Sequence, residues 1–395
     1  MKLRFKMNLE DINLWWHDKN WEKKDFELKK FNKMPIRWIP SWLDKLSLKP
    51  FSLNFVVGPR QVGKTTGIKL LIDKLLSTLK PMQIFYLDLE LLTDLKELRE
   101  ALLFYFELRK KEKLNHSFLF LDEVTKLEGW YNIVKGFIDL GELKKDVVIV
   151  SGSSSANLLK HAESFAGRRG KGKDIFVMPL SFKEFVEVNK VNVKRKDKVK
   201  EAFLSYTELG GFPKSINKLT KGEEFIKAFE LEIMKNDLSV EIAKQIFFAL
   251  FDMVPSALSF NAIANKIGKS NKTVEAYIET FQDLFIAKIA YWKDKQINFR
   301  KEKKIFLRDP FLARTFAWWC NKEIRKDFLY EWIVQEHLLR KFGEIYYYRN
   351  RYEIDCIAKN LKVEVKAGKP YRKYPRGVKV VDETNIAEFL LSLEI

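Results

Sequence analysis

The sequence predicts an α/β fold in which a parallel sheet is followed by a helical module and a second, smaller α/β domain. Between residues 51 and 180, short apolar runs alternate with helix-like stretches, a pattern typical of a parallel sheet covered on both faces. Apolar residues at helical spacing make residues 221–290 mostly helical, and from Arg325 onward a helix leads into strand-like runs. We therefore expect four parts: residues 1–50, 51–190, 191–300 and 301–395.

A glycine-rich loop opens the second of these parts. It follows the apolar run 51–57 and precedes a helix-like stretch, residues 66–79. The loop consists of Gly58, Pro59, Arg60, Gln61, Val62, Gly63, Lys64, Thr65 and Thr66. Strand, loop and helix in this order are the setting in which G-x-x-x-x-G-K-[ST] binds nucleotide phosphates. The glycines let backbone N–H groups surround the phosphates. We assign Lys64 to the β- and γ-phosphates and Thr65 to Mg²⁺. The sequence thus predicts a P-loop core, residues 51–190, with ATP and Mg²⁺ as cofactors.

Two carboxylates follow the apolar run 118–121. We expect Asp122 to orient Mg²⁺ through its water shell and Glu123 to polarise the water that attacks the γ-phosphate. Their strand is expected beside the phosphate loop. The alternative is that these acidic residues only cap a helix.

A serine-rich segment, Ser151–Ser155, follows the next strand-like run. Ser153 is the predicted sensor of the γ-phosphate. An equally good interpretation is a strand-to-helix turn with Ser155 as the N-cap.

A pair of arginines stands between Gly167 and Gly170. Arg168 or Arg169 is expected to stabilise charge on the transferring phosphoryl group. It would do so within the chain or across to a neighbouring subunit of a homo-oligomer. The alternative is an exposed basic turn.

The composition bounds the class of protein. The formal net charge of +19 favours a polyanionic partner such as nucleic acid, although lysines spread along the whole chain also fit a generally lysine-rich composition. No apolar stretch is long enough to cross a bilayer, and no signal-peptide segment opens the chain. We therefore expect a cytoplasmic protein without a membrane partner. Cys320 and Cys356, the two cysteines, lack C-x-x-C spacing and predict neither a disulfide framework nor a cysteine zinc site.

The leader, residues 1–50, is rich in tryptophan. It is too apolar for a disordered tail. We expect it to pack on the core that follows, with an aromatic platform for nucleic-acid bases as the alternative.

Several motifs occur in the order in which a known family carries them: Gly58–Thr66, Phe120–Glu123, Ser151–Ser155, Gly167–Arg168 and Pro179–Phe185. In this the chain resembles AAA-superfamily ATPases of archaea and bacteria that carry a C-terminal domain of unknown function. The segments Asn13–Trp16 and Pro35–Pro40 resemble the archaeal branch, with Leu14 where that family usually shows proline. The resemblance implies an ATP-hydrolysing enzyme whose C-terminal domain is nuclease-like.

Within residues 191–300, a short amphipathic stretch (260–268) ends in glycine and a second helix begins after Ser270, a good N-cap. This resembles a helix-turn-helix, followed by a wing-like strand, residues 286–292. The residues expected to face DNA are Lys269, Asn271, Lys272 and Tyr277. The alternative is a winged-helix lid that packs on the ATPase core and contacts no nucleic acid.

The last part, residues 301–395, carries the pattern of PD-(D/E)xK nucleases. Glu364 and Lys366 lie on one face of a strand, because side chains alternate. Asp355 lies on the neighbouring strand and would share Mg²⁺ with Glu364, while Lys366 would orient the attacking water. Glu331, on the preceding helix, matches the upstream acidic residue. Five downstream residues are expected to contact phosphates: Lys369, Arg372, Lys373, Arg376 and Lys379. The alternatives are an edge hairpin with alternating charges and a fold relic without activity.

The sequence as a whole predicts a Mg²⁺-dependent, DNA-associated ATPase with a nuclease site at its C-terminal end. The alternative function is an ATP-dependent regulatory switch, whose C-terminal domain binds a partner without catalysis.

Overall fold

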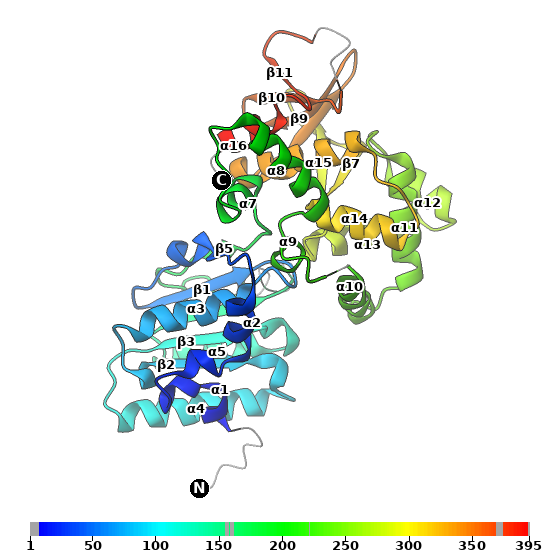
Figure 1. Cartoon of the computed structure of the whole chain (residues 1–395). Helices are drawn as coiled ribbons and strands as arrows, with labels where there is room; N and C mark the ends of the chain where they lie inside the picture. The colour runs from blue at the N-terminus through cyan, green and yellow to red at the C-terminus, as the bar shows by residue number, and fades with distance from the viewer. Residues whose placement is uncertain (1–7, 155–157, 159–161, 221, 369–373, 394–395) are drawn as a thin grey trace. The chain divides into compact units, whose positions relative to one another are not determined.

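The computed structural model describes residues 8–154, 158, 162–220, 222–368 and 374–393. The chain divides into two compact units, Met1–Met178 and Pro179–Ile395 (Figure 1). We call these the N-terminal unit and the C-terminal unit. Within the described ranges, none of the helices has the length and apolar character needed to span a bilayer.

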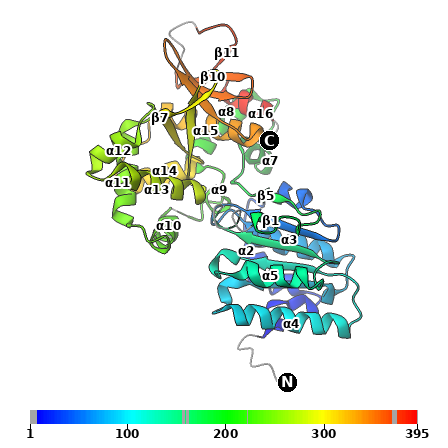
Figure 2. The same cartoon turned by 180° about the vertical axis from the view of Figure 1, so that it is seen from behind.

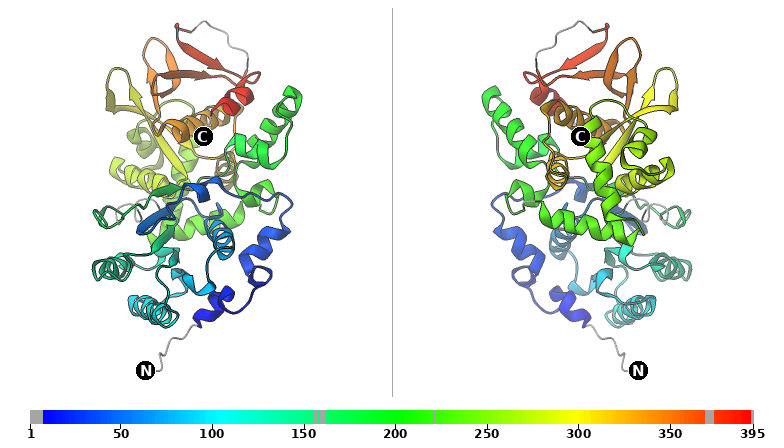
Figure 3. Two further views of the ribbon diagram at one scale, coloured as in Figure 1. Left: turned by 90° about the vertical axis from the view of Figure 1, so that its left-hand side faces the viewer. Right: turned by 90° about the vertical axis from the view of Figure 1, so that its right-hand side faces the viewer.

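A five-stranded parallel sheet forms the centre of the N-terminal unit, with the strand order β2-β3-β4-β1-β5. The strands are β1 (Ser52–Val57), β2 (Ile84–Asp88), β3 (Phe118–Asp122), β4 (Val147–Gly152) and β5 (Asp174–Phe176). Helix α3 (Lys64–Leu76) and helix α2 (Phe26–Lys33) lie on one side of the sheet, and α4 (Leu95–Lys111) and α5 (Trp130–Asp139) lie on the other (Figure 3). The expected α/β class with a parallel-sheet core is confirmed.

Local chemistry decides where these helices begin. Helix α3 begins at Lys64, two residues earlier than expected, because Gly63 adopts a left-handed backbone (φ +92°) that turns the loop directly into the helix. Helix α4 begins only at Leu95, because the Asp94 carboxylate accepts the N–H of Glu97 as an N-cap.

The leader covers the edge of this sheet at β2. The indole N–H groups of Trp15 and Trp16 both donate to the carbonyl of Ile84, at 3.1 and 2.9 Å. The Asn13 amide bonds both the N–H (2.7 Å) and the carbonyl (3.0 Å) of Tyr86. Side chains thus satisfy the backbone groups that an edge strand leaves unpaired. These rings are buried, so they are not available for stacking on bases. The short leader elements are α1 (Leu9–Ile12), η1 (Leu14–Trp16), η2 (Trp21–Lys23) and η3 (Ser41–Lys45).

The C-terminal unit contains a six-stranded mixed sheet, with the order β11-β10-β9-β8-β6-β7 (Figure 2). Its strands are β6 (Ala287–Lys293), β7 (Ile297–Leu307), β8 (Tyr346–Arg349), β9 (Glu353–Ala358), β10 (Leu361–Val365) and β11 (Val378–Val381). The expected wing strand is β6, which pairs with β7 and also with β8. The helical module and the C-terminal domain therefore share one sheet, and the expected boundary between residues 300 and 301 falls inside β7.

Helices surround this sheet and form the rest of the unit. They are α7 (Phe182–Val188), α8 (Lys196–Leu209), α9 (Pro213–Ile216), α10 (Glu223–Lys235), α11 (Val240–Met253), α12 (Phe260–Ile267), α13 (Asn271–Asp283), α14 (Pro310–Trp319), α15 (Lys326–Phe342) and α16 (Ile386–Ser392). Stacked aromatic rings pack α11, α13 and α14 against one another. The ring centroid of Phe247 lies 4.5 Å from that of Phe281 and 4.2 Å from that of Phe316.

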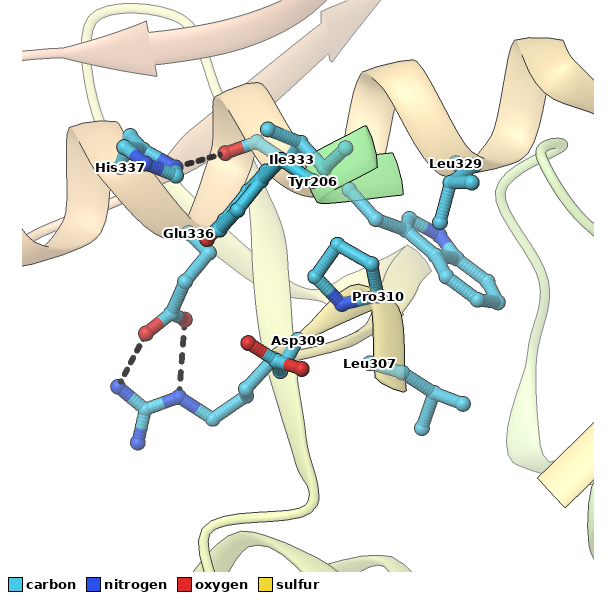
Figure 4. A pocket seen from close by; sticks show the side chains of 10 residues that line it. Tyr206, Leu307, Asp309, Pro310, Leu329, Ile333, Glu336 and His337 are labelled. Carbon is cyan, nitrogen blue, oxygen red and sulfur yellow. Dashed lines mark hydrogen bonds and ion pairs between the residues drawn. The ribbon is translucent and has the colours of Figure 1, made fainter. Parts of the chain in front are cut away.

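His337 on α15 fixes the start of α7. Its Nδ1–H donates to the Ile333 carbonyl (2.7 Å), and its Nε2 accepts the N–H of Phe182 (2.9 Å). Figure 4 shows this ring above Glu336. The Glu336 carboxylate accepts two hydrogen bonds from the Arg308 guanidinium, at 2.9 and 3.1 Å. The described side chains fill the depression between these residues and leave no volume for a water molecule. Burial and the nearby Arg340 charge lower the pKa of His337 to about 4.

Candidate functional site

The glycine-rich loop joins β1 to α3 and has the backbone that its sequence requires. Gly58 approaches the next strand so closely that a Cβ there would lie 2.0 Å from the carbonyl oxygen of Val177. Gln61 and Gly63 both have positive φ, at 62° and 92°. Nothing lies within 4 Å of a Cβ built on Gly63, so the loop borders open space there. The loop is thus a strained turn at a helix N-terminus, which favours anions.

Lys64 is the first residue of α3 and is buried (4% exposed). Its ammonium donates to the carbonyls of Gly58 (2.9 Å) and Pro59 (3.0 Å) within the loop. It also lies 3.8 Å from Oε1 of Glu123. Burial lowers the pKa of Lys64, and the Glu123 and Asp122 charges oppose this shift. The positive charge of Lys64 therefore lies at the loop, and the carboxylate oxygen that it contacts, on Glu123, is 3.8 Å away.

Asp122 ends β3 and is fully buried in a network of donors. The Tyr86 hydroxyl donates to its Oδ2 (3.0 Å). The Ser151 hydroxyl donates to its Oδ1, and the Glu123 N–H donates to the same oxygen at 3.1 Å. Ser151 belongs to β4, which lies between β1 and β3. The expectation that Asp122 lies on the strand beside the phosphate loop is therefore wrong, because β4 is inserted between them.

Glu123 follows Asp122 in a left-handed conformation (φ 48°), which glutamate seldom adopts. This turn points the carboxylate back toward Lys64. Its buried Oε2 has no hydrogen-bond partner among the residues that the structure describes. Such backbone strain and an unsatisfied buried acceptor are typical of functional sites.

Sequence reasoning missed Asp88. This residue ends β2 and is the register partner of Asp122 on β3. Burial, together with the Asp122 charge, raises the pKa of Asp88 to about 6. The available signal was that Asp88 also ends a strand-like run, since the carboxyl ends of parallel strands meet at one sheet edge.

A buried lysine behind the site was missed as well. Lys69 on α3 pairs with Asp25, the N-cap of α2, at 3.2 Å. Its ammonium lies 3.7 Å from the centroid of the Tyr86 ring, whose hydroxyl holds Asp122. The leader is thus linked to the acidic end of β3 through Lys69 and Tyr86.

Ser153 lies one residue beyond β4 and is buried. It shares the carboxyl edge of the sheet with Asp88 and Asp122, because all these strands are parallel. Ser155, the N-cap in the alternative interpretation, lies outside the described residues.

The two arginines hold carboxylates of the same unit. Arg168 Nε lies 2.6 Å from Asp139 on α5. Arg169 lies 2.6 Å from Asp174 on β5, with its guanidinium 4.7 Å from the centroid of the Phe55 ring. Both arginines are therefore paired with carboxylates of their own unit, which favours the basic-turn interpretation within one chain.

The residues of the loop fit a nucleotide and its magnesium ion. The open space beside Gly63 suits phosphates, and the unsatisfied Oε2 of Glu123 suits a water molecule. Thr65 and Asp122 supply the oxygen atoms that Mg²⁺ prefers. Within the described ranges, no group of three or more His, Cys, Asp or Glu side chains has a geometry that would hold a metal unaided. A metal at the loop would therefore depend on the phosphates for further ligands.

The helix pair α12 and α13 has the expected local chemistry. Gly268 has a left-handed backbone, and Ser270 caps α13 by accepting the N–H of Thr273. The expectation that Tyr277 faces DNA is wrong. It is buried, and its hydroxyl accepts the N–H of Ser239 (2.7 Å) and donates to the Ser239 carbonyl (3.1 Å). Lys269, Asn271 and Lys272 are exposed.

A groove of about 550 Å³ separates these helices from the β6–β7 hairpin. Glu275 and Glu279 line its helix side, and Arg300 and Lys303 line its hairpin side. Because the helix side is acidic, this groove does not present the single basic face that a DNA backbone requires.

The C-terminal carboxylates come together as the sequence predicts. The antiparallel register of β9 and β10 aligns Cys356 with Val363, which sets Asp355 opposite Glu364 on one face. Lys366 Nζ lies 2.7 Å from Glu364 Oε1, and Glu331 approaches from α15. Both Asp355 and Glu364 are buried.

Lys304 on β7, a residue that sequence reasoning missed, lies among these carboxylates. Its ammonium contacts Asp355 (2.7 Å), Glu331 (2.9 Å) and Glu353 (3.0 Å). The Val365 N–H donates to the other oxygen of Asp355 (2.9 Å). The Lys304 ammonium lies where a divalent metal would have to bind, so the residues in this arrangement do not fit one. Lys304 stands in a run of charged residues, so no sequence signal marks it.

Two of the basic residues expected to contact phosphates, Arg376 and Lys379, are exposed near β11. The other three, Lys369, Arg372 and Lys373, lie outside the described residues.

Comparison with known proteins adds two family matches. Residues 51–186 match the model of an AAA domain, and residues 200–322 match a domain of unknown function, DUF8612. The uncharacterized protein MJ1544 of Methanocaldococcus jannaschii is 23% identical over 344 residues, which cover 79% of this chain and 73% of that protein.

Two solved structures from Aeropyrum pernix resemble the chain distantly. The ORC2 protein in its ADPNP-ADP complexes gives a TM-score of 0.40 at 10% identity, covering 71% of this chain and 92% of that one. The ORC1 protein in complex with DNA gives 0.35 at 11% identity, covering 67% and 86%. Similarity at this level does not assign a function. The sheet, the glycine-rich loop and the family match together make residues 51–186 an AAA-type P-loop domain.

Proposed function

We propose that the P-loop domain binds ATP with Mg²⁺ and hydrolyses it. The observation that carries this proposal is the pairing of Lys64 with Glu123 across the mouth of the loop, at 3.8 Å. A cation for the phosphates and a carboxylate for water then lie close together beside the loop. This is the arrangement that phosphoryl transfer to water needs.

Each side chain has a distinct task in this proposal. Bound Mg²⁺·ATP would supply the phosphoanhydride bond and a cation between the β- and γ-phosphates. The backbone N–H groups of residues 60–65 would surround the phosphates, and Lys64 would neutralise their charge. Thr65 and Asp122 orient the metal, and the hydroxyls of Ser151 and Tyr86 fix the rotamer of Asp122.

Glu123 is the proposed acceptor for the attacking water. Its unsatisfied Oε2 can take a hydrogen bond from that water, and its left-handed backbone holds the carboxylate in place. Ser153 is the proposed sensor of the γ-phosphate, because it shares the same edge of the sheet.

The arginine that stabilises the transition state is proposed to act between subunits. Arg168 lies on the surface, and its partner Asp139 is exposed as well. An exposed ion pair is weak, so the arginine of one subunit can be drawn to the site of a neighbouring copy. Arg169 is more enclosed, by Asp174 and Phe55. This makes Arg168 the better candidate and a homo-oligomer the expected active form.

The proposed partner is nucleic acid, DNA first. The net charge of +19 supports this, as do exposed Lys269 and Lys272 at the start of α13. The acidic groove beside α13 supports the alternative, a regulatory switch whose C-terminal unit recognises a protein partner without catalysis. The expected C-terminal nuclease is the weaker proposal, because Lys304 holds its carboxylates.

One experiment separates these functions: ATP hydrolysis with and without duplex DNA, at two salt concentrations. A DNA-associated ATPase shows turnover that DNA stimulates, and the stimulation falls steeply as salt rises. A switch retains ATP without turnover, and DNA leaves it unchanged. If ATP neither binds nor turns over under any of these conditions, the proposed function is wrong.

A further inference from the structure

Lys304 is a buried lysine of the C-terminal unit. Only 3% of the residue is exposed, although it lies on an edge strand of the sheet. Its side chain leaves β7 and ends between α15 and β9, where it contacts three carboxylates within 3.0 Å. Burying an ammonium is costly unless such partners surround it.

The geometry matches the donor capacity of an ammonium group. A lysine has three N–H donors, and Asp355, Glu331 and Glu353 provide one acceptor each. Mg²⁺ would require ligand oxygens at about 2.0–2.1 Å in near-octahedral geometry. The Asp355 oxygens instead face Lys304 and the Val365 N–H. A divalent ion would have to displace Lys304 from the centre of the cluster.

The electrostatics follow the same logic. Burial acts to lower the pKa of Lys304, but the charges of Asp355, Glu331 and Glu353 raise it well above its usual value. Burial and the Asp355 charge raise the pKa of Glu364, which lies beside Lys366. Lys304 thus pairs with Asp355, Glu331 and Glu353, and Lys366 pairs with Glu364. Gln335 supports the arrangement by donating to Glu331 Oε1 (2.9 Å).

We propose that Lys304 is the built-in cation of this carboxylate cluster, taking the place that a divalent metal would occupy in a nuclease. The C-terminal unit then holds Asp355, Glu331 and Glu353 together without metal, and removing the Lys304 charge opens a divalent-cation site. The cluster serves to clamp β7 against α15 and β9. This inference stands apart from ATP hydrolysis, which uses residues of the other unit.

The test measures Mn²⁺ binding to the nucleotide-free, full-length chain. Electron paramagnetic resonance reports the concentration of Mn²⁺ that stays free in solution. The wild type is expected to show no Asp355-dependent binding. Lys304→Met keeps the apolar stem and removes the charge, so it should gain a site at least about tenfold tighter than any in the wild type. Adding Asp355→Asn should abolish that site. Lys303→Met is the matched control, since Lys303 Nζ bonds the carbonyls of Phe299 and Lys301 and touches no carboxylate of the cluster.

Thermal unfolding guards against a folding defect. Lys304→Met should melt below the wild type and recover when Mn²⁺ is added, whereas Lys304→Arg should stay folded and bind no Mn²⁺. The proposal is overturned if the wild type binds Mn²⁺ through Asp355. It is also overturned if Lys304→Met neither binds Mn²⁺ nor is stabilised by it.

Discussion

Lys64 in the N-terminal unit and Lys304 in the C-terminal unit are both buried near carboxylates, but their surroundings differ. Lys64 bonds two backbone carbonyls and stays 3.8 Å from its one carboxylate contact, so burial lowers its pKa. Lys304 contacts three carboxylates directly, and these raise its pKa well above the usual value. A buried cation that no directly bonded carboxylate neutralises is available to bind an anionic ligand. A buried cation that is fully neutralised holds structure instead.

The same contrast holds for the carboxylates. Glu123 keeps one buried oxygen without a hydrogen-bond partner among the described residues. Asp355 uses both oxygens, one on Lys304 and one on the Val365 N–H. Unsatisfied groups cost stability and are kept where a ligand completes them. The comparison therefore supports the proposal that the phosphate loop carries the chemistry and that the C-terminal cluster contributes stability.

The largest expected effect is on ATP turnover by Lys64→Ala. Losing the cation at the phosphates should slow hydrolysis by about 1,000-fold, the size seen when one transition-state donor is removed, and weaken nucleotide binding. Steady-state phosphate release measures the first effect, and fluorescent-nucleotide titration the second. Lys74→Ala is the control, since Lys74 is exposed on the same helix. Turnover by Lys64→Ala at the wild-type rate would remove the ATPase assignment.

The C-terminal cluster should respond in stability rather than turnover. Asp355→Asn leaves Lys304 with an uncompensated part of its buried charge, which should cost about 3 kcal/mol of unfolding free energy. Urea denaturation measures the loss, and ATP turnover is the parallel readout. Asp294→Asn, on the exposed β6–β7 turn, serves as the control. A fall in turnover with unchanged stability would reverse the roles that the comparison assigns.

Glu123→Gln tests the open acceptor at the loop. The amide keeps the shape but accepts a water proton poorly, so hydrolysis should fall by about 100-fold while ATP still binds. Rapid-quench measurement of a single turnover isolates the chemical step. Glu128→Gln, a few residues further along the chain, is the matched change. Loss of binding together with turnover would mean that Glu123 only holds Lys64 in place.

The C-terminal unit should also lose stability in acid through His337. Because its pKa in the folded protein is about 4, against about 6.5 when unfolded, the unfolded chain binds a proton first as pH falls. The stability contribution is complete above pH 6.5 and is lost toward pH 4, by about 2 kcal/mol between pH 7 and pH 5. Urea midpoints of the wild type and His337→Gln at both pH values measure it. Equal pH dependence in the two proteins would contradict the prediction.

The smallest expected effect distinguishes the two arginines. Arg168→Ala should lower kcat by about tenfold with little change in ATP affinity, and Arg169→Ala should change kcat less, because Arg169 is held by Asp174 and Phe55. Mixing Arg168→Ala with an Asp122 variant should restore some activity if the arginine acts between subunits. Unchanged kcat in both single variants would favour the alternative interpretation, in which the two arginines only form an exposed basic turn.

Much of the phosphate-loop site follows from the sequence because its parts are local. The spacing of Gly58, Gly63 and Lys64 sets the turn, and the left-handed Gly63 leads directly into α3. The alternation of side chains along β10 likewise places Glu364 and Lys366 together, and they meet at 2.7 Å. Apolar runs of strand length were enough for the parallel sheet, since both of its faces are covered.

Tertiary structure alone decided the neighbours of these residues. The sheet order inserts β4 and its Ser151 between the loop strand and Asp122. The pairing of β6 with β8 joins the expected wing to the C-terminal sheet, and β7 then delivers Lys304 to Asp355, 51 positions away. Such contacts depend on which strands pair over long distances. One lysine in a charged run is therefore indistinguishable from its neighbours until the sheet is assembled.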